Sequence, residues 1–342
     1  MIKVLIVDDS PLIRAVLTEV LNQANDIKVI GTANDPYQAR DLIKQLNPDV
    51  ITLDVEMPKM DGVSFLKNLM RLRPMPVIMI STLTQQGAPI TLECLDLGAV
   101  DFVAKPTQQV GDKLQEYANT LHEKIRAAAQ AKVRSIKAQS ANNSVVTQSA
   151  FDNTKLIAIG ASTGGTEAIK EVLNALPSHF PPIVITQHIP PVFSASFAER
   201  MDRMTNLSVC EAKDGQQILS DNVYIAPGNY HLEVVNRAGK LFCKVTQSEP
   251  INRHRPAVDV LFESVAKLGL NHKVGAALLT GMGADGAEGL LTLKESGALT
   301  LAQDESTSVV WGMPRAAIDI DAAQQILGLE KIAPVLANWA KK

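Results

Sequence analysis

Residues 155–165 read Lys-Leu-Ile-Ala-Ile-Gly-Ala-Ser-Thr-Gly-Gly, and this stretch decides the fold of the second half of the chain. A short apolar run that ends in glycines ahead of a helical pattern is typical of a buried strand that turns into a helix. Similar runs, separated mostly by helical patterns, recur at 182–186, 222–225, 274–279 and 298–301. This alternation predicts a doubly wound, mostly parallel α/β sheet. Two further runs, 232–235 and 241–245, predict a small antiparallel hairpin.

Ser162 occupies the centre of a G-x-S-x-G pattern at residues 160–164, the pattern of a nucleophile elbow. A sharp strand-to-helix turn leaves no room for side chains beside the nucleophile, which explains the glycines. The start of the following helix offers free N–H groups that favour a developing negative charge. The alternative is a phosphate-binding turn, a degenerate dinucleotide loop, although the G-x-G-x-x-G spacing is absent.

A histidine and an aspartate follow two other strands of the same expected sheet. The run 182–186 ends in Gln187-His188, and Asp285 lies in Gly-Met-Gly-Ala-Asp-Gly at 281–286. With Ser162 they would form a triad in which His188 takes the serine proton and Asp285 holds the imidazole. The order Ser, His, Asp disfavours the α/β-hydrolase fold, whose order is Ser, Asp, His. The other five histidines, including His254, remain alternatives for the base, and Asp304 remains an alternative for the acid.

The first 106 residues show the same strand–helix alternation. Apolar runs at 3–7, 27–31, 49–53, 76–80 and 101–104 predict a five-stranded parallel sheet covered on both faces. The strand ends carry Asp8 and Asp9, Asp54, Ser81 and Lys105. Carboxylates gathered at one sheet edge need a cation, and an all-oxygen cluster suits Mg²⁺. A metal-bound carboxylate beside a hydroxyl and a lysine predicts a phosphoryl acceptor.

A basic connector separates two acidic blocks. Residues 1–106 carry 10 Lys/Arg against 13 Asp/Glu, residues 107–150 carry 6 against 3, and residues 151–342 carry 17 against 20. Apolar residues from Val110 to Ile125 recur every three or four positions and predict an amphipathic helix. The uncharged stretch 138–150 reads as a flexible linker. We therefore expect domains at 1–126 and 151–342, joined by a linker at 127–150.

Composition excludes several classes of protein. Of the 342 residues, 46% are apolar and 20% charged, as in an ordinary globular chain, and the formal net charge of −3 argues against nucleic-acid binding. The chain reaches Asp8 too soon for a signal-peptide core, and no apolar run approaches the ~20 residues needed to cross a bilayer. Three widely spaced cysteines without a CxxC pair fit free thiols in a reducing cytoplasm.

Three motifs of the first block resemble those of a response-regulator receiver domain. They are Val-Leu-Ile-Val-Asp-Asp-Ser at 4–10, Asp-Val-Glu-Met-Pro-Lys-Met-Asp-Gly at 54–62 and Val-Ala-Lys-Pro at 103–106. The resemblance implies a flavodoxin-like sheet with Asp54 as the phosphorylated residue. It assigns Mg²⁺ to Asp8, Asp9, Asp54 and the carbonyl of Glu56. It also implies that Ser81, Phe102 and Lys105 form the phosphorylation switch.

The second block resembles the catalytic domain of the CheB family, the chemotaxis protein-glutamate methylesterases. The resemblance rests on residues 159–168, Gln-His-Ile-Pro-Pro at 187–191, 224–228, Arg-His-Arg-Pro at 253–256, 281–286 and 302–314, with Trp311 where a tyrosine is common. It implies Ser162, His188 and Asp285 as the triad. The Met282 N–H would then serve the oxyanion hole, with Thr163 in the same site.

Together the resemblances imply a monomeric, cytoplasmic, phosphorylation-activated esterase. Its substrates would be glutamyl methyl esters on methyl-accepting chemoreceptors, released as glutamate and methanol, with receptor glutamine deamidation as a second activity. A chemotaxis histidine kinase would be the phosphodonor, and the esterase reaction itself would need no cofactor. Two alternatives stay open: a catalytically inactive adaptor controlled by phosphorylation, and a hydrolase of small-molecule esters or peptides.

Overall fold

The computed structural model describes residues 1–57, 60–82, 84, 87–106, 114–133 and 150–342. The chain forms two compact units, Met1–Ser140 and Ala141–Lys342. The predicted linker at 127–150 lies mostly outside the described residues, as does Val110 of the predicted amphipathic helix. The described residues 127–130 of the predicted linker belong to the helix Leu114–Gln130.

The N-terminal unit is a parallel five-stranded sheet with the strand order β2-β1-β3-β4-β5. The chain runs first toward one edge and then toward the other, so the direction of winding changes between β1 and β3, where a doubly wound sheet builds its site. The carboxyl ends of these two central strands carry Asp8, Asp9 and Asp54. The elements are β1 (Ile2–Val7), α1 (Pro11–Asn22), β2 (Ile27–Ala33), α2 (Pro36–Leu46), β3 (Val50–Asp54), α3 (Gly62–Leu72), β4 (Val77–Ser81), α4 (Gly87–Asp96), β5 (Asp101–Ala104) and α5 (Leu114–Gln130).

The C-terminal unit contains a seven-stranded sheet with the order β14-β13-β12-β6-β7-β9-β8, and every strand pairing in it is parallel. The strands are β6 (Leu156–Ala161), β7 (Ile183–Gln187), β8 (Ser208–Glu211), β9 (Asn222–Ile225), β12 (Val274–Leu278), β13 (Leu299–Gln303) and β14 (Gln325–Leu327). β10 (His231–Arg237) and β11 (Lys240–Thr246) form a separate antiparallel hairpin.

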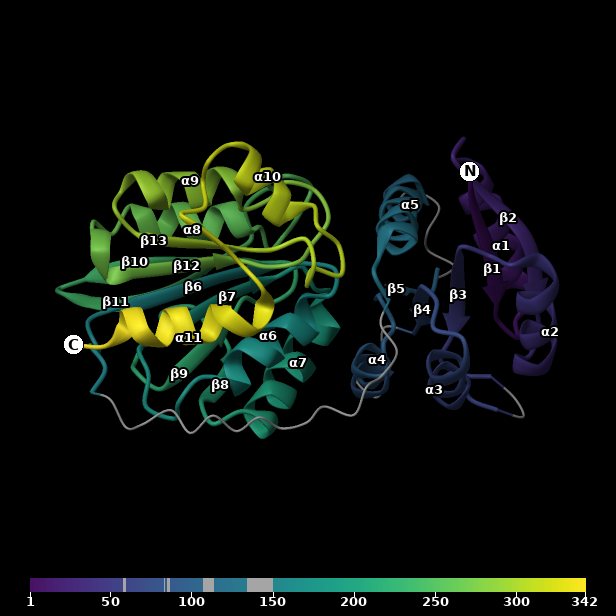
Figure 1. The fold of residues 1–342 in the computed structure, drawn as a ribbon, viewed down its shortest axis with the longest axis horizontal. Helices are drawn as coiled ribbons and strands as arrows, with labels where there is room; N and C mark the ends of the chain where they lie inside the picture. Colours follow the sequence, from purple (N-terminus) through teal and green to yellow (C-terminus); the bar gives the residue numbers. More distant parts are fainter. Residues whose placement is uncertain (58–59, 83, 85–86, 107–113, 134–149) are drawn as a thin grey trace. The chain divides into compact units, whose positions relative to one another are not determined.

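Helices cover both faces of this sheet (Figure 1). One layer holds α6 (Gly165–Asn174), α7 (Pro191–Met204) and α11 (Leu329–Ala340), and the opposite layer holds α8 (Val258–Ala266), α9 (Ala287–Glu295) and α10 (Met313–Asp319). A short 3-10 helix, η2 (Asn271–Lys273), precedes β12. The hairpin packs on α8, and apolar side chains from β6, β12, α8 and α9 fill one core between them.

The predicted fold class is confirmed in both units, including the hairpin. Two strands were not predicted, β8 and β14, and both lie at an edge of the large sheet. Ser208–Glu211 offers only two apolar side chains, and β14 has three residues with Ile326 52% exposed. An edge strand is covered on fewer sides, so it needs no continuous apolar run and gives no such signal. In the part of the chain that the structure describes, no helix is both long and apolar enough to span a bilayer.

Candidate functional site

The turn after β6 fixes the position of Ser162 through its backbone. The Ser162 N–H donates to the Thr280 carbonyl at 3.0 Å, and the Ser162 carbonyl accepts from the Gly165 N–H at 2.7 Å and from Gln187 Nε2 at 2.8 Å. These partners belong to the ends of β12, α6 and β7. Because three neighbouring elements hold one residue, the serine cannot shift without disturbing all of them.

Two glycines give this turn the room it needs. Gly164 has a φ of +77°, and a Cβ there would lie 2.6 Å from the Cβ of Val309. A Cβ on Gly281 would lie 2.7 Å from the Cβ of Ser162 and 2.3 Å from the sulfur of Met313. All three distances are shorter than real Cβ contacts, so close packing requires both glycines, as the sequence pattern predicted for Gly164.

Ser162, His188 and Asp285 lie in one hydrogen-bonded chain. His188 Nδ1 is 3.1 Å from Ser162 Oγ, and His188 Nε2 is 2.7 Å from Asp285 Oδ2. A carboxylate only accepts, so it assigns the ring proton to Nε2 and leaves Nδ1 free to accept from the serine hydroxyl. The three residues follow β6, β7 and β12, which are adjacent at the centre of the sheet. The pairing needed for nucleophilic attack is therefore in place.

Asp285 lies among hydrogen-bond donors. Besides His188, its carboxylate accepts from the Val258 N–H at 2.6 Å, the Asp259 N–H at 3.2 Å and Asn252 Nδ2 at 3.0 Å. Burial acts to raise the pKa of Asp285, but the hydrogen bond and charge of His188, with the bonds from Val258 and Asn252, outweigh it and hold that pKa below its usual range. The Val258 and Asp259 N–H groups open helix α8, whose dipole also favours the negative charge.

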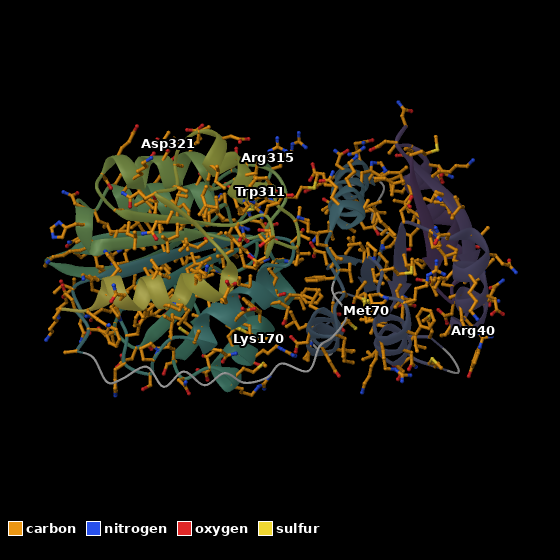
Figure 2. All side chains as sticks on the ribbon, viewed as in Figure 1. Arg40, Met70, Lys170, Trp311, Arg315 and Asp321 are labelled. Atoms are coloured by element: carbon orange, nitrogen blue, oxygen red, sulfur yellow. The ribbon has the colours of Figure 1, made fainter. Side chains whose placement is uncertain are left out.

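Met282 lies in the loop after β12 and directly follows Gly281, which packs against Ser162. No described residue accepts a hydrogen bond from the Met282 N–H, while the neighbouring Gly281 carbonyl accepts from the N–H groups of Gly312 and Met313 at 3.0 and 2.8 Å. Trp311 pairs with Gly281 in a short parallel bridge, and Arg315 lies over its ring at 5.9 Å (Figure 2). The 311–313 segment therefore holds the backbone of the loop at Gly281, next to Met282.

The other residues that the sequence suggested for this site are Thr163, Asp304 and His254, and each has different contacts. Thr163 is buried, and its carbonyl accepts from Thr280 Oγ1 at 2.9 Å. Asp304 holds its own turn by accepting from Thr307 and Ser306, whereas the imidazole of His188 bonds to Asp285. His254 is a neighbour of the base, because its ring stacks on that of His188 with centroids 3.7 Å apart and planes at 16°.

The N-terminal unit brings together Asp8, Asp9 and Asp54. One carboxylate oxygen from each lies within 4.8 Å of the others, and Asp8 and Asp54 are buried. Lys105 Nζ lies 2.6 Å from Asp54 Oδ2 and 3.7 Å from Asp8 Oδ2. Burial raises the pKa of Asp54 to about 6; the Lys105 bond opposes that rise, and the charge of Asp8 adds to it. Burial also raises the pKa of Asp8.

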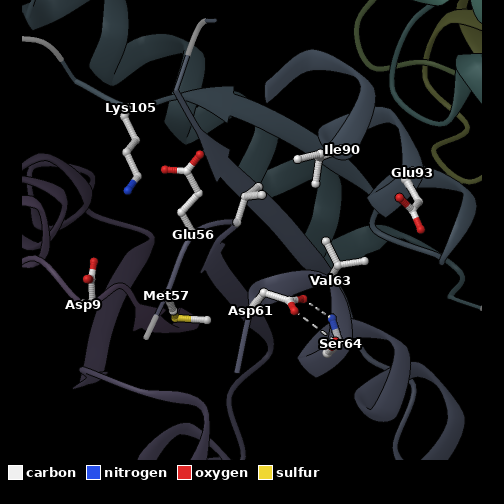
Figure 3. Close-up of a pocket in the computed structure, with 10 residues that line it drawn as sticks. Asp9, Glu56, Met57, Asp61, Val63, Ser64, Ile90, Glu93 and Lys105 are labelled. Atoms are coloured by element: carbon white, nitrogen blue, oxygen red, sulfur yellow. Dashed lines mark hydrogen bonds between the residues drawn. The ribbon is translucent and has the colours of Figure 1, made fainter. Parts of the chain in front are cut away.

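This acidic cluster has the properties of a divalent-cation site. The buried Asp8 Oδ2 has no hydrogen-bond partner among the described residues, and one lysine cannot balance three carboxylates. Hard oxygen ligands of this kind suit Mg²⁺. A hollow of about 860 Å³ opens beside the cluster, with Asp9, Glu56 and Lys105 at one side and Val63, Ile90 and Glu93 at the other (Figure 3).

The other predicted receiver residues, Ser81, Glu56 and Phe102, have contacts of their own. Ser81 Oγ accepts from Thr91 Oγ1 at 2.7 Å. The Glu56 N–H donates to Asp54 Oδ1 at 3.2 Å. Phe102 is buried on β5, with Lys124 Nζ 5.5 Å from its ring centre.

Sequence reasoning missed Asn252 and Asp259. Asn252 Nδ2 donates to Asp285 Oδ1 and to Asp259 Oδ2, and Asp259 also accepts from the Gly289 N–H at 2.7 Å. Burial raises the pKa of Asp259, and the charge of Asp285 adds to the rise. Residue 252 precedes the quoted Arg-His-Arg-Pro motif directly, but its contact with residue 285 spans 33 positions. Nothing local in the sequence indicates such a contact.

Comparison with known proteins gives the same division of the chain. Residues 157–336 match the sequence model of the family described as CheB methylesterase, and residues 4–118 match that of the response regulator receiver domain. The chain is 54% identical to the protein-glutamate methylesterase/protein-glutamine glutaminase 1 of Hahella chejuensis, covering 98% of this chain and 96% of that protein. It is 53% identical to the protein-glutamate methylesterase/protein-glutamine glutaminase 2 of Saccharophagus degradans, covering 100% of this chain and 99% of that protein.

A solved structure agrees with the C-terminal fold. The crystal structure of the Thermotoga maritima CheB methylesterase catalytic domain superposes with a TM-score of 0.52 and 39% identity, covering 54% of this chain and 97% of that one. Identity of about half over the whole length of two relatives exceeds what fold similarity alone produces. The chain therefore belongs to the CheB methylesterase family, with a response regulator receiver domain ahead of the methylesterase domain.

Proposed function

We propose that the chain is a serine hydrolase that removes methyl esters from glutamate side chains of methyl-accepting chemoreceptors and converts receptor glutamines to glutamate. The observation that carries this proposal is the hydrogen-bonded chain from Ser162 through His188 to Asp285. Relatives named protein-glutamate methylesterase/protein-glutamine glutaminase support the choice of substrate.

In the proposed reaction, Ser162 Oγ attacks the ester carbonyl while His188 Nδ1 takes the hydroxyl proton. The Met282 N–H donates to the oxyanion, and Asp285 stabilises the imidazolium that forms. His188 returns the proton to the leaving methoxide, so methanol departs and an acyl-serine remains. Water, deprotonated by His188, then attacks the acyl carbon; the bond to Ser162 Oγ breaks, His188 returns the proton to Oγ, and glutamate is released. With glutamine as substrate the leaving group is ammonia. These steps use side chains and backbone alone, and Thr163 supports the same site.

The N-terminal unit is proposed to switch this activity. Asp54 would be phosphorylated, with a chemotaxis histidine kinase as phosphodonor. Asp8, Asp9, Asp54 and the Glu56 carbonyl would hold Mg²⁺, which neutralises charge on the transferred phosphoryl group. Lys105 would pair with the phosphoryl oxygens, and Ser81 and Phe102 would complete the switch. We retain a receiver at 1–126, a linker at 127–150, an esterase domain at 151–342 and a monomeric state as parts of this proposal.

The decisive test is methanol release from methylated receptor membranes by Ser162→Ala. We expect a fall of about 10⁴-fold or more, because the nucleophile is lost while binding remains. Ser296→Ala, at the end of α9, is the matched control and should keep the wild-type rate, since Ser296 Oγ bonds to the Leu293 carbonyl, away from the triad. A Ser162→Ala protein at the wild-type rate would remove the proposed nucleophile.

The switch is tested on the full chain with a small phosphodonor and Mg²⁺. Wild type should release methanol faster after the addition, and Asp54→Asn should not respond. Both proteins should share the same rate before the addition. A wild-type rate that phosphodonor leaves unchanged, with phosphorylation verified by mass, would rule out control by the receiver.

A further inference from the structure

The segment between β11 and α8 makes a tight turn whose two central residues have left-handed backbones. The Ile251 N–H donates to the His254 carbonyl at 3.1 Å, and the His254 N–H returns a bond to the Ile251 carbonyl at 2.8 Å. Asn252 and Arg253 have φ of 52° and 66°. Residues other than glycine seldom adopt this conformation, and asparagine is among those that tolerate it best.

The two side chains that flank Arg253 in this turn contact the proton relay at different points. Asn252 is exposed overall, but its Nδ2 reaches inward and donates to Asp285 Oδ1 at 3.0 Å and to Asp259 Oδ2 at 2.7 Å. The ring of His254 covers one face of the His188 ring at 3.7 Å between centroids. One short turn therefore contacts both the acid and the base.

Both ends of the segment are anchored away from the relay. His231 is fully buried; its Nδ1 accepts from the Ala257 N–H at 3.2 Å, which leaves Nε2–H to donate to the Glu249 carbonyl at 3.0 Å. Arg255 donates to Asn229 Oδ1 through Nε and Nη2 and to the Ser248 carbonyl through Nη1. The turn is thus held by hydrogen bonds to β10, to the loop that precedes β10 and to its own flanks, independently of Ser162.

We propose that the turn 251–254 is a positioning element for proton transfer, in which Asn252 orients the Asp285 carboxylate and His254 holds the plane of the His188 ring. Asn252 adds a donor on Oδ1, the oxygen that does not face His188, so it restrains rotation of the carboxylate. Stacking restrains rotation of the imidazole and gives the imidazolium an aromatic face to lie on. Both residues act through the triad, not on the reacting carbonyl.

The proposal rests on the proposed serine chemistry, and Asn252→Gly tests its first half. Glycine adopts the left-handed backbone freely, so this change removes the amide and keeps the turn. We expect kcat for methanol release to fall about 10- to 100-fold with KM unchanged, since one donor to a buried carboxylate is lost. Asn271→Gly is the matched control: Asn271 also has a positive φ, of 49°, but precedes β12 at the opposite end of the strand from the triad.

Two further comparisons distinguish positioning from general destabilisation. His254→Ala should lower kcat about 3- to 10-fold, and His254→Phe, which keeps a flat ring, should recover most of that loss. In the Asp285→Asn background, Asn252→Gly should add less than about twofold, because the carboxylate it orients is gone. A full additional loss in that background, or equal losses for alanine and phenylalanine at 254, would overturn the proposal.

A fluorophosphonate that phosphonylates activated serines separates this proposal from the choice of substrate. If wild type and Ser162→Ala incorporate the same amount of probe, Ser162 is not the labelled nucleophile and the proposed serine chemistry fails. If wild type labels at Ser162 while Asn252→Gly and His254→Ala label at the wild-type rate, the serine chemistry stands and the positioning role is wrong. Slower labelling of both variants, with Asn271→Gly at the wild-type rate, supports the role whatever the natural ester is.

Discussion

The two parallel sheets of this protein each bury an aspartate beside the end of a central strand, but with different partners. Asp54 lies beside two other carboxylates and a single lysine, and its pKa is raised to about 6. Asp285 accepts hydrogen bonds from His188, Asn252 and the first N–H groups of α8, and its pKa is lowered. Equivalent places in the two sheets thus differ: at Asp54 the negative charge exceeds the positive charge nearby, whereas at Asp285 hydrogen-bond donors of the protein stabilise the carboxylate.

This contrast explains how a single architecture serves two chemistries. A carboxylate with unmet acceptor capacity attracts a metal ion and a phosphoryl group, whereas a carboxylate saturated by donors stays ionised and orients a histidine. Each site also takes its residues from adjacent central strands, where the winding direction of the sheet changes.

Within the comparison of the two aspartates, the largest expected effect comes from removing the charge of Asp285. Asp285→Asn should lower kcat about 10⁴-fold, because an amide can donate to His188 and so favour the wrong ring tautomer. Methanol release under saturating substrate measures it. Asp304→Asn is the control for the sequence alternative and should stay near the wild-type rate, since the Asp304 carboxylate bonds within its own turn. The reverse ranking of the two variants would assign the acid to residue 304.

Crowding the serine turn should have the next largest effect on activity. Gly281→Ala would place a Cβ 2.7 Å from the Cβ of Ser162, so either the serine or the Met282 loop must move. We expect kcat to fall about 10²-fold, as displacement of reacting groups by about 1 Å does. Gly239→Ala, in the hairpin turn with nothing near its Cβ, controls for loss of glycine. Equal activities of the two variants would show that the turn accommodates the added Cβ without displacing Ser162, contrary to the packing distances.

Removing the charge of Asp54, in contrast, should increase the stability of the receiver. The pKa of Asp54 rises from 3.8 to about 6 on folding, so the ionised carboxylate costs stability fully above about pH 6 and not at all below about pH 4. In EDTA, Asp54→Asn should therefore increase the unfolding free energy of the receiver at pH 8 by up to about 3 kcal/mol, and the gain should fade toward pH 4.

Urea unfolding can measure this change unit by unit. Both tryptophans, Trp311 and Trp339, belong to the C-terminal unit, so their fluorescence is an internal control that should not change, while far-UV circular dichroism reports both transitions. Mg²⁺ should stabilise the wild-type receiver at pH 8 and have little effect on Asp54→Asn. A variant less stable than wild type at pH 8 without metal would show that the Lys105 bond outweighs burial.

Sequence patterns predicted most of the architecture, because buried strands such as 156–161 and 274–278 are apolar throughout. Each is followed by a turn that contains glycine and polar residues, which marks where the strand ends. They also nominated Ser162, His188 and Asp285, which the fold brings into contact because parallel strands share one edge. The patterns left two aspartates open as the acid, because Asp304 and Asp285 both follow strands, and they did not single out His188 from the other five histidines. Only the packing of α8 against the loop after β12 distinguishes the two aspartates, and the Asn252 contact depends on that same packing.

The smallest expected effect comes from Asp26, which forms a solvent-exposed ion pair. Asp26 accepts from Arg126 Nε and Nη2 at 2.7 and 2.8 Å, and the Arg126 hydrogen bond lowers the pKa of Asp26 to about 2 without burial. The stability it contributes is present above about pH 4 and lost as the pH falls through about 2. Because solvent and salt screen an exposed pair, Asp26→Asn should shift the urea midpoint of the receiver far less than Asp54→Asn and in the opposite direction, and added salt should shrink the shift. A shift as large as that of Asp54→Asn would mean that burial is not what separates the strong carboxylate sites of this protein from the weak one.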